Sequence, residues 1–293
     1  MHSGIVHAVS AYVLWGLFPL YFTRVAHVGA TEVLVHRIVW SLVFVLALLA
    51  WQRRWAWLAA LLKQPRVLGA FAASALLLSC NWLTYIWSVQ NGHLIDASLG
   101  YFITPLVNVV LGYTVLHERP RRAQWFALGL AALGVVWLTV QAGQLPWMAL
   151  VLSLSFGVYG LLRKIAPLGA LEGLSLETML LAPPALVALV AWWGRGPASF
   201  PTPDLATNLW LVAAGPLTAV PLLLFASGAR RVSMTTLGLL QYIGPSIAFL
   251  LGIWVFHEPF SSARLVGFLF IWSALVVYSA DGWRIARRAL AGA

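Results

Sequence analysis

Long apolar runs are the feature of this sequence that most limits its fold. The chain has 293 residues, of which 61% are apolar and only 9% charged, and its mean hydropathy is +0.88. So few polar side chains cannot cover the surface of a soluble domain. Because about 20 apolar residues cross a bilayer as a helix, we predict an all-α integral membrane protein. Ten spans are expected, at 5–23, 31–51, 67–90, 98–116, 122–140, 146–163, 174–193, 207–229, 235–256 and 262–281.

Lysine and arginine gather on one side of these spans. The even-numbered loops and the C-terminal tail carry 14 of the 18 basic residues, including Arg163 and Lys164 at the end of the sixth span. The positive-inside rule then predicts that both termini face the cytoplasm. The net charge of +10 does not indicate nucleic-acid binding, because the basic residues form no clustered face. A single cysteine, Cys80, excludes an intrachain disulfide.

The sequence repeats itself once. "ITPLVNVVLGYTVLHERP" (103–120) and "IGPSIAFLLGIWVFHEPF" (243–260) share Ile, Pro, Gly, His and Glu in register. Because each half holds five spans, an odd number, the second half must enter the membrane in the opposite sense. We therefore predict two inverted five-helix repeats, at 1–141 and 146–284, and a basic cytoplasmic tail at 285–293. This architecture is typical of secondary transporters with a site near the membrane midplane.

Several stretches carry a resemblance to a known family, and they cover most of the chain. They are "YVLWGLFPLYF" (12–22), "EVLVHRIVWS" (32–41), "NWLTYIWSVQNGHLIDASLGYFITPLVNVVLG" (81–112), "SFGVYGLLRK" (155–164) and "LGLLQYIGPSIAFLLGIWVF" (237–256). The chain resembles the EamA-like drug/metabolite transporter superfamily, most closely its RarD-type members. The resemblance implies a permease of the bacterial inner membrane, with ten helices in two inverted repeats, that exports small organic metabolites or drugs. It does not imply a particular substrate.

Charged residues within the second predicted span are candidates for function. Glu32 and His36 are four residues apart, so they share a helix face and can form a hydrogen bond. Arg37 lies about six residues into the span, where it either lines a site, clamps helices or snorkels to the surface. Glu32 is a candidate for proton transfer or gating, or is a helix-start residue favoured by the dipole.

Other polar and aromatic residues are expected at depth. Asn81 and Tyr85 lie on one face of the third span, which either lines a cavity or bonds a neighbouring helix. Asp96 either caps the fourth span or acts in gating. Pro105 and Pro245 occupy equivalent repeat positions and are candidate hinges, because each removes a helical hydrogen bond. The predicted cavity is completed by Trp15, Tyr101, Asn108, Tyr159, Gln241 and Tyr242.

A secondary transporter is the function that these patterns favour. The sequence has no P-loop, no HExxH motif and no nucleophile elbow, so ATP-driven transport and hydrolysis have no support. We expect alternating access for a small organic molecule, with Glu32, His36, Asp96 and Glu177 as candidates for proton coupling. A membrane-embedded enzyme or sensor is the alternative. No cofactor, metal or nucleic acid is expected, and the choice between monomer and homodimer stays open.

Overall fold

The computed structural model describes residues 2–61, 63–90, 94–143, 147–192, 200–202, 204–255 and 262–291, and they form an all-helical bundle. Eight helical segments in this part of the chain are long and apolar enough to cross a membrane. The first half contains α1 (His2–Gly16), α2 (Phe18–Phe22), η1 (Thr23–Val25), α3 (Ala30–Gln52), α4 (Ala56–Leu61), α5 (Pro65–Gln90), α6 (Leu94–Thr114) and α7 (Arg122–Ala142). The second half contains α8 (Trp147–Ile165), α9 (Ala170–Trp192), α10 (Leu205–Ala229), α11 (Met234–Gln241), α12 (Ile243–Trp254) and α13 (Ser262–Ala291).

Proline has different effects in different helices. The ninth predicted span is divided at Tyr242 into α11 and α12, and Pro245 follows the break at a position where it cannot donate to the Gln241 carbonyl. The equivalent Pro105 leaves α6 as a single helix. Pro183 and Pro184 also leave α9 continuous, and both are exposed on its surface. A proline within a predicted span therefore does not always interrupt the helix.

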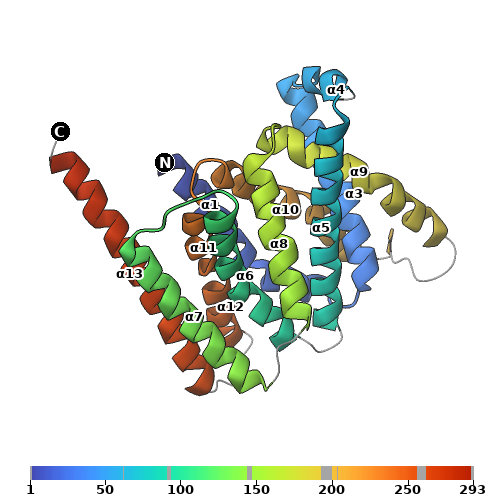
Figure 1. Ribbon diagram of the computed structural model, residues 1–293. Helices are drawn as coiled ribbons and strands as arrows, with labels where there is room; N and C mark the ends of the chain where they lie inside the picture. Colours follow the sequence, from blue (N-terminus) through green and yellow to red (C-terminus); the bar gives the residue numbers. More distant parts are fainter. Residues whose placement is uncertain are drawn as a thin grey trace.

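Packing between the two halves follows a pseudo-twofold symmetry. α1 contacts α10 and α12. Its counterpart α8 contacts α5 and α6, which are the counterparts of α10 and α12. Likewise α3 packs on α10, and the equivalent pair α9 and α5 is also in contact. Equivalent helices meet directly in three pairs, α3 with α9, α6 with α11, and α7 with α13. The inverted repeat is thus expressed in the packing as well as in the sequence. In Figure 1, α7 and α13 lie side by side at one edge of the bundle.

The contact between α6 and α11 is close because it uses a glycine. A Cβ atom on Gly238 would lie 2.7 Å from the Pro105 carbonyl oxygen, so a side chain there would force the helices apart. Beside this contact, Asn108 Nδ2 donates to Gln241 Oε1 over 2.9 Å. A fixed amide pair thus joins the repeats next to both prolines.

Glu118 connects the halves at one end of the bundle. Its carboxylate accepts hydrogen bonds from the backbone N–H groups of Met234 (2.7 Å) and Thr235 (3.1 Å). These N–H groups open α11 and have no acceptor within the helix, so the carboxylate of one repeat caps a helix of the other. The repeat counterpart, Glu258, lies outside the described residues. The start of α1 and the end of α13 both lie in the upper part of Figure 1, as does α4.

Candidate functional site

Arg37 is buried between the two repeats. It lies in the second turn of α3 with 4% of its surface exposed, and its Nε donates to Thr218 Oγ1 of α10 over 3.0 Å. The guanidinium carbon is 4.5 Å from the centre of the Trp82 ring. The rings of Phe18 and Phe22 lie at 5.8 and 5.9 Å. Aromatic faces attract a cation at these distances, so Arg37 is held by a hydroxyl and several rings.

No carboxylate forms an ion pair with Arg37 among the residues that the structure describes. The cluster extends to Tyr85, whose ring lies 5.8 Å from that of Phe22. The rings of Tyr85 and Tyr101 meet edge to face at 5.5 Å. A cation at membrane depth is unfavourable without an anion or water nearby. The Arg37 cluster is therefore a positively charged aromatic site, made up of Phe18, Phe22, Arg37, Trp82, Tyr85, Tyr101 and Thr218.

A pocket of about 500 Å³ adjoins this cluster. Phe22 and Tyr85 line the pocket and also belong to the Arg37 cluster. The remaining lining comes from η1, the turn between η1 and α3, the start of α3 and the end of α5: Val25, Ala26, His27, Val28, Gly29, Val33 and Ile86. The pocket lies at the end of α3 opposite to α4, and Phe22 and Tyr85 form its boundary with the Arg37 cluster.

Glu177 forms a second charged cluster, in α9. Its side chain is fully buried, and its Oε1 accepts a hydrogen bond of 2.5 Å from Ser74 Oγ of α5. Arg163 of α8, 1% exposed, places its Nη1 3.9 Å from the same oxygen. The ring of Phe71 lies 5.5 Å from the Arg163 guanidinium, and Tyr159 is buried beside the carboxyl group. Ser74, Tyr159, Arg163, Glu177 and Phe71 are called the Glu177 cluster below.

Arg163 is the functional candidate that the sequence reasoning missed. Its position at the end of an apolar run suggested only a marker of topology, but the side chain turns inward and its Nη2 donates to the Gly169 and Ala170 carbonyls. A Cβ on Gly173 would lie 1.9 Å from Arg163 Nη1, so the absence of a side chain there makes room for the guanidinium. Gly173 was the only residue in the sequence that indicated this contact. Its role becomes apparent only when α8 and α9 are seen together.

Arg37 and Glu177 occupy equivalent positions in the two repeats. They are separated by the same offset as Pro105 and Pro245, and their helices α3 and α9 are counterparts. Arg37 donates a hydrogen bond to the Thr218 hydroxyl of α10, and Glu177 accepts one from the Ser74 hydroxyl of α5. The helices α10 and α5 are also counterparts. The fold thus places a cation and an anion at symmetry-related sites in an inverted pair of repeats.

An aromatic cluster holds two of the residues predicted to line a cavity. The Trp15 ring lies 5.4 Å from Phe156 and 5.5 Å from Phe225. Tyr159 stacks on Phe225 at 6.0 Å, so this tyrosine belongs to both the aromatic cluster and the Glu177 cluster. Its hydroxyl has no hydrogen-bond partner that meets normal geometry among the described residues.

Other predicted site residues join helices. Asn81 Nδ2 donates to the Leu152 carbonyl (2.9 Å) and to Ser155 Oγ (3.0 Å), which ties α5 to α8. Tyr242, fully buried, donates to the Phe102 carbonyl over 3.2 Å. These groups use their hydrogen-bonding capacity within the protein, whereas Tyr85 and Tyr101 lie beside Arg37.

His36, near the start of α3, forms a hydrogen bond that differs from the one expected with Glu32. His36 Nδ1 accepts a hydrogen bond of 3.1 Å from Trp40 Nε1, and its ring lies 4.9 Å from that of Phe200. His36 therefore bonds the residue four positions after it, in place of Glu32 four positions before. Glu32 is buried, with 4% of its surface exposed. Asp96 lies in the first turn of α6, and its side chain is outside the described part of the structure.

The sequence matches the EamA-like transporter family over residues 2–140 and 146–280, one match in each half. The chain belongs to this family. It is 49% identical to an uncharacterized transporter of Pseudomonas aeruginosa, across 98% of this chain and 97% of that protein. It is 47% identical to Protein RarD of Streptomyces exfoliatus, across 99% of this chain and 92% of the relative. A crystal structure with 18% sequence identity covers 97% of this chain and 99% of its own with a TM-score of 0.70, so the two share a fold.

This EamA-family protein is therefore a multi-pass membrane transporter and not an enzyme. The predicted fold class, two inverted repeats of membrane helices, is confirmed. The resemblance to RarD-type proteins is confirmed as well.

Proposed function

We propose that this protein is a secondary transporter that exports a small organic compound bearing an anionic group, and that Arg37 binds that group. The supporting observation is a buried guanidinium that has aromatic neighbours and, among the described residues, no carboxylate partner. A carboxylate or phosphate on the cargo would supply the missing counter-ion through charge-assisted hydrogen bonds. The rings of the Arg37 cluster suit an apolar or aromatic portion of the same molecule.

The proposed setting is the bacterial inner membrane, with both termini in the cytoplasm and transport by alternating access. The bias of basic residues supports this orientation. The pocket beside the Arg37 cluster then opens toward the outer side, where exported cargo leaves. Symmetry-related packing of the two repeats supports a mechanism in which one repeat moves against the other.

Proton coupling is assigned to Glu177 in this proposal. Its carboxyl group can bind either a proton or the Arg163 guanidinium, since both neutralise its charge in a buried setting. Protonation would release Arg163 from the pair and change the contact between α8 and α9. Glu32, His36 and Asp96 are the other candidates, and Glu177 is preferred because the Arg163 guanidinium lies 3.9 Å from its carboxylate.

The cargo-binding proposal is tested by transport into proteoliposomes with matched acid and amide forms of candidate metabolites. We expect transport of the acids, and in Arg37→Gln a rise in their KM of roughly 10- to 100-fold, as for loss of a hydrogen bond to a charged group. Arg24→Gln is the matched control, because Arg24 is an exposed arginine of η1 near the same end of the bundle. Equal transport of acid and amide, or equal effects of the two substitutions, would contradict the proposal.

The coupling proposal needs an imposed pH gradient. We expect the gradient to drive accumulation in the wild type, and Glu177→Gln to abolish this response while downhill exchange continues. Glu32→Gln serves as the comparison variant and should keep the response. Flux that ignores the gradient in the wild type would reject coupling without affecting the role of Arg37.

A further inference from the structure

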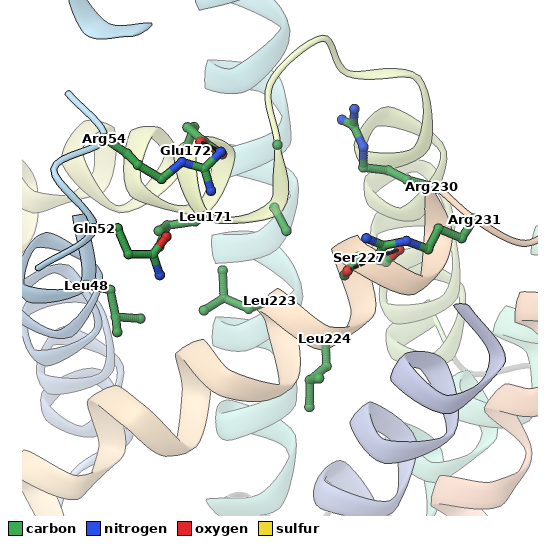
Figure 2. A pocket seen from close by; sticks show the side chains of 12 residues that line it. Leu48, Gln52, Arg54, Leu171, Glu172, Leu223, Leu224, Ser227, Arg230 and Arg231 are labelled. Atoms are coloured by element: carbon green, nitrogen blue, oxygen red, sulfur yellow. Dashed lines mark hydrogen bonds and ion pairs between the residues drawn. The ribbon is translucent and has the colours of Figure 1, made fainter. Parts of the chain in front are cut away.

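A second pocket, of about 600 Å³, lies at the end of the bundle that bears α4. It is open on one side and is bordered by the last turns of α3 and α10, the first turn of α9 and the residues next to them (Figure 2). None of its lining residues belongs to the Arg37 cluster or to the Glu177 cluster. Its chemistry is therefore unexplained by the proposed transport site.

The lining of this pocket changes from apolar to charged along the helices. On α10, Leu224 and Ser227 are three residues apart on one face of the helix, and Arg230 and Arg231 follow directly after its last residue, Ala229. On α3, Leu48 and Gln52 repeat this order one turn apart. One turn of helix rises about 5.4 Å, which is comparable to the headgroup layer of one leaflet, about 5–8 Å. The leucines of the pocket thus match the acyl chains of a lipid, and its arginines match the charged headgroup.

The polar part of the pocket carries an excess of positive charge. Three guanidiniums face one carboxylate, and Arg54 Nη2 pairs with Glu172 Oε1 at 2.6 Å. Arg230 Nη1 donates to the carbonyls of Ala166 (2.7 Å) and Leu168 (2.5 Å), which fixes the loop before α9 against the end of α10. Two positive charges remain without a carboxylate partner among the described residues.

The two arginines without a carboxylate are positioned by neutral groups. Arg231 donates to the hydroxyl and carbonyl oxygens of Ser227, and Arg230 to the loop carbonyls described above. Both side chains are exposed, and Figure 2 shows the Arg231 guanidinium beside Ser227, while the Arg230 side chain extends away from it toward the loop before α9. Guanidiniums held in this way can still share donors with a phosphate, which accepts from them in bidentate geometry.

We propose that this pocket binds the phosphate headgroup of an anionic phospholipid, with Arg230 and Arg231 on the phosphate and the first part of an acyl chain along Leu223 and Leu224. Basic pockets between membrane helices on the cytoplasmic side are suited to anionic headgroups. This end of the bundle carries most of the basic residues and is the predicted cytoplasmic end, where the leaflet is anionic. The site would hold the ends of α3, α9 and α10 together across the two repeats.

The test compares lipids on the intact protein. Wild-type protein in mixed micelles is exposed to phosphatidylglycerol and phosphatidylcholine with identical acyl chains, and retained lipid is measured by native mass spectrometry. We expect phosphatidylglycerol to be retained preferentially. Each arginine near the headgroup contributes a factor of about five, so Arg230→Gln with Arg231→Gln should lower that preference about 25-fold. Arg122→Gln, an exposed arginine that begins α7 on the same side, is the matched control and should change nothing.

Soluble phosphate is tested in parallel, because it offers the same chemistry without the acyl chains. If millimolar inorganic phosphate or glycerol 1-phosphate displaces phosphatidylglycerol completely, the ligand is a soluble phosphate and the lipid assignment is wrong. Equal retention of the two lipids by the wild type would also overturn it, as would equal losses in the pocket variant and in Arg122→Gln. Since the pocket contains no proposed cargo contact, these outcomes are independent of the transport assays on Arg37.

Discussion

The pair formed by Arg163 and Glu177 should stabilise the fold only while both partners are present. Replacing Arg163 by Met leaves the Glu177 carboxyl group buried with Ser74 as its partner. At the observed 3.9 Å, two unit charges attract by about 4 kcal/mol at an effective dielectric constant of about 20. Breaking a buried ion pair typically costs about 3–5 kcal/mol, so the two arguments agree. We expect a loss of this size for Arg163→Met.

The double variant is the informative one. Arg163→Met with Glu177→Gln removes both charges, and the glutamine oxygen can still accept from Ser74. The loss should therefore fall to about 1 kcal/mol, because neither partner is left as an uncompensated charge. Reversible unfolding of the four proteins in mixed micelles gives the coupling free energy as a double-mutant cycle.

A second ion pair in the same protein provides the control. Arg54 and Glu172 are closer, at 2.6 Å, but 54% of the Arg54 side chain is exposed. Solvent screening should reduce their coupling to less than about 1 kcal/mol. If the effects at Arg163 and Glu177 are additive, with a coupling free energy below about 0.5 kcal/mol, the two side chains do not form an ionised pair that stabilises the fold, and the prediction is wrong.

Two further predictions concern a glycine and a helix cap. Gly173→Ala should destabilise the protein by about 1–3 kcal/mol, because the new methyl group would lie 1.9 Å from Arg163 Nη1, whereas Gly129→Ala in α7 meets no atom within 4 Å and should be neutral or stabilising; thermal unfolding of the two variants separates these outcomes. Asp204 caps α10, and hydrogen bonds from Thr207 and Ala206 lower the pKa of its carboxyl group below 3.8. The cap should therefore stabilise the first turn of α10 above about pH 4 and lose this effect as the pH falls through the lowered pKa. Hydrogen exchange at the amides of 206–208 should show that dependence, and its persistence in Asp204→Ala would contradict it.

Much of the architecture was predictable from the sequence because hydropathy and repetition are properties of a linear chain. Apolar runs of membrane length predicted helices, and the match between 103–120 and 243–260 predicted the inverted halves. The span ends were approximate: α6 begins at Leu94 and α9 at Ala170, each four residues before the predicted start. The short helix α4 was not predicted, since six residues give no clear period.

The candidate site was only partly predictable. Arg37 stood out because a guanidinium is rare in an apolar run, and Tyr85 and Tyr101 of the Arg37 cluster were among the predicted cavity residues. Arg163 did not stand out, because an arginine at the end of a span usually faces the headgroups. The amide of Asn81 could have lined a cavity or joined helices, and its two bonds to α8 became apparent only when that helix was in place.

The sequence by itself determined that this chain lies in a membrane, that it consists of two related halves, and that these halves have opposite orientation. Each of these properties depends on composition, run length and the parity of five spans. The tertiary structure decided which charges meet. Whether Arg163 faces water or Glu177 depends on the helix packed alongside, and contacts between distant segments leave no periodic signal in either segment alone.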